Sequence, residues 1–324
     1  MASSTPGSGM TEESPTQNRV IHDTLGLEEP QEHRSLRQDV WRQFKQHKGA
    51  VVGLVLLTLI VLATIFGPMI WPIDPFLIET ANGNAGPTLK HPLGTDNLGR
   101  DVFARLLVGG RISLSVGFAA MVFGLILGTG IGVLAGFFRV LDGALMRLTD
   151  LFLALPILPL LLVVILLFRD TLKEAFGPEL GIFLLVVFII GVTSWMQTAR
   201  IVRGEVLSIK QQEFVLAARS IGSRKRNVLL RHILPNVLSP VMVSAALGVA
   251  TAIITESALS FLGLGFPASF PTWGRLLFDA NNYIQISPIR VIAPGVMISL
   301  SVMSVNFIGD GVRDALDPKL RSKG

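Results

Sequence analysis

Long apolar runs, separated by polar segments rich in proline and glycine, dominate the chain after its first fifty residues. A helix needs about 20 apolar residues to cross the hydrocarbon core of a bilayer. A buried helix in a soluble protein explains one such run, but not six. The pattern therefore predicts an all-α, polytopic membrane protein with about six transmembrane helices, at residues 50–70, 112–138, 148–168, 182–196, 237–257 and 291–308.

Composition agrees with this interpretation. Half of the 324 residues are hydrophobic and only 16% are charged, whereas soluble domains average about 25% charged residues. The absence of cysteine excludes disulfides, thiolate catalysis and cysteine metal sites, and the five scattered histidines predict no metal site. A pI near 9.9 reflects cationic cytoplasmic segments in such a protein, so we expect no nucleic-acid partner.

The positions of Lys and Arg predict the orientation. If the N terminus is cytoplasmic, 20 of the 28 basic residues lie in cytoplasmic segments and 8 in external ones. This distribution satisfies the positive-inside rule, and the reverse orientation violates it. We therefore expect a multi-pass protein of the cell (inner) membrane with both termini cytoplasmic.

The chain divides into four predicted regions. Residues 1–33 are rich in Ser, Thr, Pro, Gly and Glu and are predicted to be a disordered cytoplasmic tail. Residues 34–49 interleave cations with Leu36, Val40, Trp41 and Phe44, which predicts an amphipathic helix on membrane lipids or an ordinary extension of the first span. Residues 50–310 form the transmembrane domain, and 311–324 a cytoplasmic tail.

A stripe of glycines runs along the second predicted span. Four of them recur at every fourth residue: Gly124, Gly128, Gly132 and Gly136. Such a stripe lets another helix approach closely in a membrane. We expect helix packing rather than pore lining.

Ionisable groups also lie near the predicted spans. Arg147 and Asp150 are spaced i, i+3 and could pair on the helix, and interfacial or interhelical pairing is favoured for both over a role in the substrate path. Glu256 is expected to take part in interfacial or interhelical pairing rather than to face the substrate. No substrate path is predicted from the sequence. Two longer external segments, 71–111 and 261–288, either contact an extracytoplasmic partner or cap the helix bundle.

The most informative segment is residues 200–235, which we term the signature loop. Four residues at i, i+3, i+4 and i+7 predict one helical face: Phe214, Ala217, Ala218 and Ile221. Gly222 then provides a helix stop. A second helical run, 228–234, is expected to end at Pro235. This predicts a short helix, a sharp turn and a return to the membrane.

The run EFVLAARSIGSRKRNVLLRHILPN, residues 213–236, resembles the cytoplasmic loop of binding-protein-dependent ABC permeases. That pattern is E-A-A, three residues, Gly, nine residues, then I-x-L-P. Ala217, Ala218, Gly222, Leu234 and Pro235 match it. Leu216 stands where the pattern has Glu, and His232 where it has Ile. Glu213, one turn earlier, could supply the carboxylate.

Further segments resemble the dipeptide, oligopeptide and nickel branch of this family, as its second permease. They are WRQFKQHKGAVVGL (41–54), HPLGTDNLGRDVFARLLVGGRISLSVG (91–117), LMRLTDLFLALP (145–156), ESALSFLGLGFP with PTWGRLL (256–277) and GDGVRDALDPKLR (309–321).

The resemblance implies a type I ABC importer permease, not an enzyme. It implies a heterodimer with a homologous second permease, two ATPase subunits, and an extracytoplasmic substrate-binding protein that delivers peptide. The chain lacks G-x-x-x-x-G-K-[ST], so it is expected to bind no cofactor, with ATP and Mg on the partner subunits. The implied ATPase-coupling residues are Glu213, Phe214, Ala217, Ala218, Gly222, Leu234 and Pro235.

Other functions remain open. The same architecture could import nickel or another small solute. A secondary transporter or channel would also show six spans, but such proteins place helix breaks in related halves, and no internal repeat stands out here.

Overall fold

The computed structural model describes residues 36–316 and is helical over most of that length. Its helices are α2 (Leu36–Gln46), α3 (Lys48–Ile70), α4 (Val102–Phe137), α5 (Arg139–Ala154), α6 (Ile157–Phe176), α7 (Pro178–Ile209), α8 (Glu213–Ser220), α9 (Lys225–Val228), α10 (Leu234–Phe261), α11 (Trp273–Ala280) and α12 (Ile289–Leu316). Short 3-10 turns lie at Thr80–Asn82 and Asn281–Tyr283. The predicted tail 1–33 and residues 317–324 of the predicted C-terminal tail lie outside the described residues.

Within residues 36–316, five helical stretches are long and apolar enough to cross a membrane. They are α3, α4, α7, the continuous stretch Lys225–Phe261 and α12. Helices α5 and α6 supply a sixth if they count as one broken span. The prediction of an all-helical chain with about six spans is confirmed.

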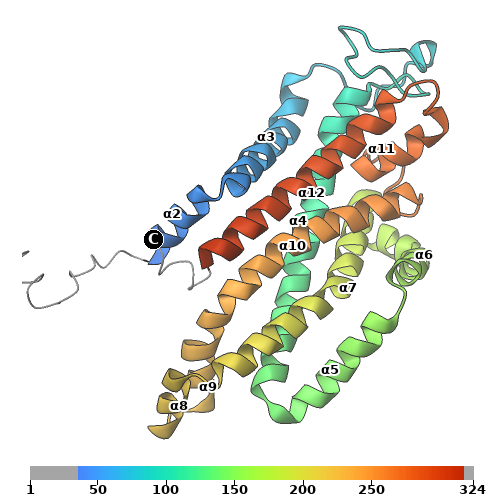
Figure 1. The fold of residues 1–324 in the computed structure, drawn as a ribbon. Coiled ribbons are helices and arrows are strands. Elements are labelled where there is room, and N and C mark those ends of the chain that lie inside the picture. Colours follow the sequence, from blue (N-terminus) through green and yellow to red (C-terminus); the bar gives the residue numbers. More distant parts are fainter. Residues whose placement is uncertain (1–35, 317–324) are drawn as a thin grey trace, which may run out of the picture.

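The third predicted span, 148–168, is not one straight helix. Helices α5 and α6 meet at an angle of 89° at Leu155 and Pro156. Proline disfavours the helical conformation of the residue before it, and Leu155 accordingly adopts φ −77° and ψ 138°. The break is therefore local: α6 packs on α7, and α5 leaves the break at a steep angle to α6 and contacts both α4 and α7 (Figure 1).

Two other predicted helix boundaries change. Helix α4 begins at Val102, ten residues before the predicted span, with Asp101 as its N-cap. The run at 228–234 does not end at Pro235 but continues into α10 through a π turn at Leu229–Ile233. Pro235 lacks an N–H and crowds the carbonyl four residues earlier, that of Arg231. This carbonyl lies within the π turn, which is wider than an α-helical turn.

The helices form one elongated bundle (Figure 1). Helix α4 packs along most of α7 and also contacts α3 and α10, while α12 lies between α3 and α10. Helix α11 and the 71–101 connection lie at one end, termed here the α11 end. Helices α8 and α9 and the turn between α4 and α5 lie at the opposite end, termed the α8 end.

The segment predicted as an amphipathic helix is a separate helix, α2. It stops at His47, whose Nδ1 accepts a hydrogen bond from the Ala50 N–H at 3.0 Å and so caps α3. Phe44 is buried with Ala50 and Ala315, whereas Trp41 is half exposed. Helix α2 is therefore held by the end of α12.

Candidate functional site

The signature loop folds as a helix, a tight turn and a helix that runs on into the bundle. Helix α8 ends in a pair of backbone hydrogen bonds: the Gly222 N–H donates to Arg219 O at 3.0 Å, and the Ser223 N–H donates to Ala218 O at 3.1 Å. This pattern requires a left-handed residue just past the helix, and Gly222 has φ +81°. Gly222 therefore sets the angle between α8 and α9.

Helix α8 is anchored to the bundle by its inner face. Val215, Ala218 and Val228 are buried. Val215 and Val228 belong to an apolar cluster that includes Val202, Val206 and Ile209 of α7 and Val237 and Val241 of α10. One apolar cluster therefore joins the loop to both helices.

The opposite face of α8 is exposed. Glu213 and Ala217 are exposed, Phe214 is 45% exposed and Ile221 is 83% exposed. The predicted apolar face is therefore wrong in one member, because Ala218 lies on the buried side. The sequence pattern also gave no indication that Val215 is buried. Its i, i+3 spacing from Ala218 was the signal that could have shown it.

Leu234 and Pro235 lie where α10 begins. Leu234 is partly buried beside the apolar cluster of α8. Pro235 is exposed and lines a cleft between helices α7, α10, α12 and α2.

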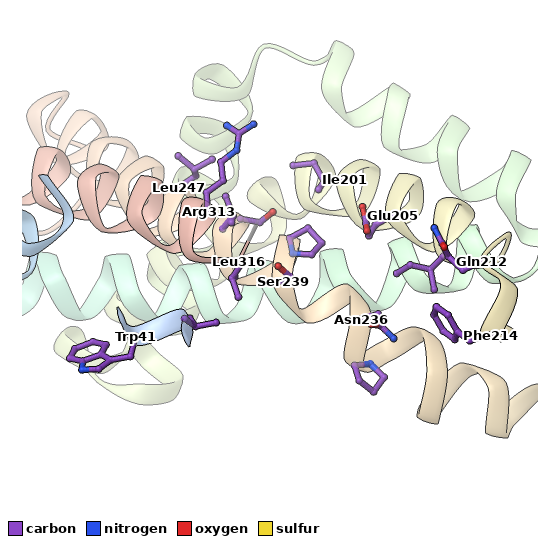
Figure 2. Close-up of a pocket in the computed structure, with 16 residues that line it drawn as sticks. Trp41, Ile201, Glu205, Gln212, Phe214, Asn236, Ser239, Leu247, Arg313 and Leu316 are labelled. Carbon is purple, nitrogen blue, oxygen red and sulfur yellow. The ribbon is translucent and has the colours of Figure 1, made fainter. Parts of the chain in front are cut away.

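That cleft has a volume of about 1270 Å³, and Phe214 of α8 is among its lining residues. Its walls mix apolar side chains with the polar groups of Asn236 and Ser239 of α10. Glu205 of α7 and Arg313 of α12 add one charge of each sign (Figure 2). The cleft therefore offers both an anionic and a cationic group to a solute or a neighbouring helix.

The four glycines of α4 are all buried and face α7. A Cβ at Gly128 would lie 2.6 Å from the Trp195 carbonyl oxygen, and one at Gly132 would lie 2.6 Å from that of Ala199. Cβ atoms at Gly124 and Gly136 would meet Ser194 and Val206, which also belong to α7. Only a residue without a side chain permits this approach of two backbones.

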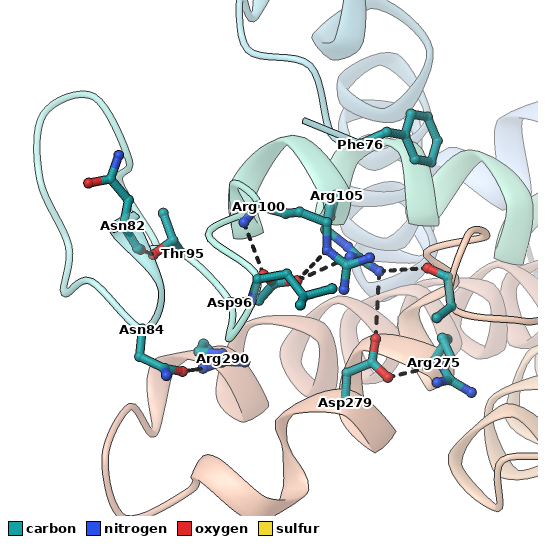
Figure 3. A network of polar contacts seen from close by, with 12 residues as sticks. Phe76, Asn82, Asn84, Thr95, Asp96, Arg100, Arg105, Arg275, Asp279 and Arg290 are labelled. Atoms are coloured by element: carbon teal, nitrogen blue, oxygen red, sulfur yellow. Dashed lines mark hydrogen bonds and ion pairs between the residues drawn. The ribbon is translucent and has the colours of Figure 1, made fainter. Parts of the chain in front are cut away.

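A buried ionic network ties the 71–101 connection to α4 and α11 at the α11 end (Figure 3). Asp96 accepts from Arg100 Nε at 2.6 Å and from Arg105 Nη1 at 3.1 Å. Arg105 is 2% exposed and also reaches Asp279 at 3.6 Å, which Arg275 holds at 2.9 Å. Buried charges require such partners, because an unpaired one is costly.

Further hydrogen bonds tie the two long connections to the helices. Arg290 of α12 donates to Asn84 Oδ1 at 2.8 Å, and Trp273 Nε1 donates to Leu106 O at 3.0 Å. Glu256 is fully buried and accepts from Ser113 of α4 at 3.0 Å and from Ser260 at 2.8 Å. Both connections are thus tied to the helix bundle at this end, and Glu256 forms an interhelical contact.

Two ion pairs join α5 to α7. Asp150 pairs with Arg200, and Asp142 accepts two hydrogen bonds from Arg203, at 2.5 and 2.8 Å. Asp150 thus forms the interhelical pair that was favoured from the sequence, and its partner is Arg200 of the neighbouring helix rather than Arg147.

Comparison with known proteins identifies the family. Residues 99–322 match the family described as the binding-protein-dependent transport system inner membrane component. Residues 35–87 match the N-terminal transmembrane domain of oligopeptide transport permease C. The chain belongs to the binding-protein-dependent permease family.

Curated relatives of this permease cover nearly its whole length. It is 39% identical over 286 residues to the dipeptide transport system permease protein DppC of Alkalihalophilus pseudofirmus, covering 88% of this chain and 90% of the relative. It is 40% identical over 288 residues to the oligopeptide permease OppC of Bacillus subtilis, covering 89% and 91%. The glutathione permease GsiD of Escherichia coli O157:H7 is 36% identical over 305 residues, covering 94% and 97%.

The fold has a solved counterpart. The methionine ABC transporter MetNI, in inward-facing conformations, matches with a TM-score of 0.54 at 18% identity, covering 66% of this chain and 97% of that one. Family membership makes this chain a membrane-embedded transport subunit rather than an enzyme. It implies, in general terms, an ATPase and a substrate-binding protein as partners.

Proposed function

We propose that this permease moves small peptides across the cytoplasmic membrane as one of two homologous permeases in an ABC importer. The relatives named for dipeptide, oligopeptide and glutathione transport, at 36–40% identity over about nine tenths of each chain, support peptide as the substrate class. The excess of Lys and Arg in alternate connections supports cytoplasmic termini. The α8 end then faces the cytoplasm.

We propose that the exposed face of α8 is the contact with an ATPase subunit, which holds ATP and Mg. Its residues are Glu213, Phe214, Ala217 and Gly222, with Leu234 and Pro235 at the return to α10. The apolar cluster under α8 supports this role, because it joins the loop rigidly to α7 and α10. Closure of the ATPase pair can then be transmitted as rigid-body movement of the helices.

We propose that the cleft between α7, α10 and α12 forms part of the cytoplasmic side of the path. A peptide carries an amino group and a carboxylate, and the cleft offers Glu205 and Arg313. Ser239→Trp should fill the cleft and lower peptide uptake about tenfold or more. Val55→Trp, on the exposed face of α3, is the control and should leave uptake within twofold.

Coupling is tested at Gly222. A Cβ there meets open space, so Gly222→Val leaves packing intact. A β-branched residue strongly disfavours φ +81°, so the end of α8 changes direction. We expect normal membrane levels and continued ATP hydrolysis with peptide uptake reduced at least tenfold. Gly204→Val in α7, also facing open space but without positive φ, is the matched control.

Two results would overturn the proposal. Full uptake by the Gly222→Val variant would remove the coupling role from α8. Purification of the complex without a second permease and an ATPase, or uptake driven by an ion gradient in the absence of ATP, would contradict the importer. ATP-driven uptake of nickel ions with no uptake of labelled dipeptide would show that the substrate is a metal ion and not a peptide.

A further inference from the structure

A second pocket at the α8 end lies apart from the cleft described above. It has a volume of about 690 Å³ and lies between the α4–α5 turn, the end of α7 and the α8–α9 turn. Four cations line it: Arg139, Lys210, Arg219 and Lys225. Among the described residues, no carboxylate lines the pocket. Its charge therefore favours an anion.

The cations of this pocket have free hydrogen-bonding capacity. Within the described part of the chain, the side chains of Arg139, Arg219 and Lys225 make no ion pair. The Lys210 ammonium donates to the carbonyls of Gly136 at 2.9 Å and Phe137 at 3.2 Å, and it has a third N–H to donate. Burial lowers the pKa of Lys210, and repulsion from Arg219 adds to this effect.

The nearest acidic side chain is already occupied. Asp142, one turn into α5, accepts from Arg203 Nε and Nη2 at 2.5 and 2.8 Å. The pair is charge-assisted and bidentate, which is a strong geometry. Asp142 attracts Lys210, but its carboxylate is held by Arg203, so one shared carboxylate faces four pocket cations and the site retains a positive charge.

The rim of the pocket is apolar on the side of the α4–α5 turn. Val140 is 92% exposed, and Leu141 and Phe138 are 41% and 37% exposed. They follow directly on the apolar helix α4, which ends at Phe137. Exposed apolar side chains beside clustered cations are typical of the boundary between lipid chains and head groups.

We propose that this pocket binds the phosphate head group of an anionic phospholipid, with Val140 and Leu141 against its acyl chains. A soluble anion would make no use of the apolar rim, whereas a phospholipid matches both parts of the site. Because Arg219 and Lys225 flank Gly222, a lipid bound here contacts the turn between α8 and α9. The lipid then holds the α4–α5 turn and the signature loop together.

The proposed orientation of the chain decides only which leaflet supplies the lipid; the binding site itself does not depend on it. The test is therefore a binding measurement that needs no transport. The full chain is purified with its co-purifying subunits, delipidated in detergent, and titrated with dioleoylphosphatidylglycerol while native mass spectrometry counts bound lipid. Dioleoylphosphatidylcholine and inorganic phosphate are the comparison ligands.

The pocket variant is Arg139→Gln, Arg219→Gln and Lys225→Gln together. These three side chains make no ion pair in the described structure, and Lys210 is retained, so folding should be unaffected. The control variant, Arg224→Gln, Arg226→Gln and Arg231→Gln, removes equal charge from exposed positions of the same loop that do not line the pocket.

We expect the wild type to bind one phosphatidylglycerol saturably and in preference to phosphatidylcholine. Each cation near an anionic lipid contributes roughly a fivefold gain in affinity, so the pocket variant should lose about a hundredfold and the control less than threefold. Equal losses in both variants, or displacement of the lipid by inorganic phosphate, would overturn the proposal. So would binding to the isolated chain that disappears in the complex with ATPase, because the pocket would then be a protein contact.

Discussion

The glycine stripe of α4 gives a sharp test of the helix packing, because α4 also contains a glycine that faces away from it. Gly128 is buried against α7, whereas a Cβ at Gly130 would have nothing within 4 Å. We consider Gly128→Ala and Gly130→Ala. The two substitutions add the same methyl group to the same helix, two residues apart.

The structure sets the size of the effect. The new Cβ at residue 128 would lie 2.6 Å from Trp195 O and 2.7 Å from Thr198 Cβ. Carbon atoms pack at about 3.5–4.0 Å, so the helices must separate by about 1 Å. Overpacking of this kind costs about 1–3 kcal/mol. Alanine favours the helix over glycine by about 1 kcal/mol at both positions, so this gain cancels in the comparison.

We therefore expect Gly130→Ala to be neutral or slightly stabilising, and Gly128→Ala to be less stable than Gly130→Ala by about 1–3 kcal/mol. The assay is equilibrium unfolding in mixed micelles of mild detergent and sodium dodecyl sulfate, followed by tryptophan fluorescence. Equal stability of the two variants would refute the close approach of α4 to α7. Gly132→Ala should behave like Gly128→Ala.

Two further predictions concern the α11 end. Arg105→Met removes a partner from both Asp96 and Asp279 and should lower the stability of this network by about 3–5 kcal/mol. The loss should be seen as faster hydrogen exchange in residues 71–101. Substitution of an exposed arginine of the same helix, Arg111→Met, should leave this exchange unchanged. Gly99→Ala, at φ +78° and with its Cβ against the Glu79 backbone, should make the same connection sensitive to protease, whereas Gly86→Ala, which faces open space, should not. Unchanged exchange or protection in Arg105→Met or Gly99→Ala would contradict the buried network.

The number and order of the spans could be predicted because the length of an apolar run is a local property. The start of α4 could not be predicted in this way. Arg105 interrupts the apolar run, and its charge is compensated by Asp96 and Asp279, the second of which lies far along the chain. The helix start itself has a local signal in the N-cap Asp101, but the apolar run gives no indication of it.

The bend between α5 and α6 had a local signal that the apolar pattern concealed. Pro156 pushes the preceding residue out of the helical region, but the surrounding leucines form one continuous apolar run. The partner of Asp150 could not be identified from the sequence, because the pairing is not local. Arg147 is near in sequence, but Arg200, which pairs with Asp150, is near only in the folded structure.

The signature loop was predicted as a motif, but its orientation was not. Periodicity grouped Ala218 with Phe214 and Ile221, since all are apolar or small. In the structure, Val215 and Ala218 are buried, Val215 within the apolar cluster of α7 and α10, whereas Phe214 is exposed. Which face of so short a helix is buried depends on its neighbours.

The π turn at Leu229–Ile233 has a consequence for the rotational phase of the loop. A π turn accommodates one residue more than an α-helical turn. The turn therefore absorbs one residue without rotating the helix on either side of it. If Leu229–Ile233 were rewound as regular α-helix with no residue removed, the α9 side would rotate by about 100° relative to α10 and shift by about 1.5 Å along the axis. Val228 would then leave its buried position. The π turn thus keeps the angular register at which the helical stretch Lys225–Phe261 presents α9 to the rest of the bundle.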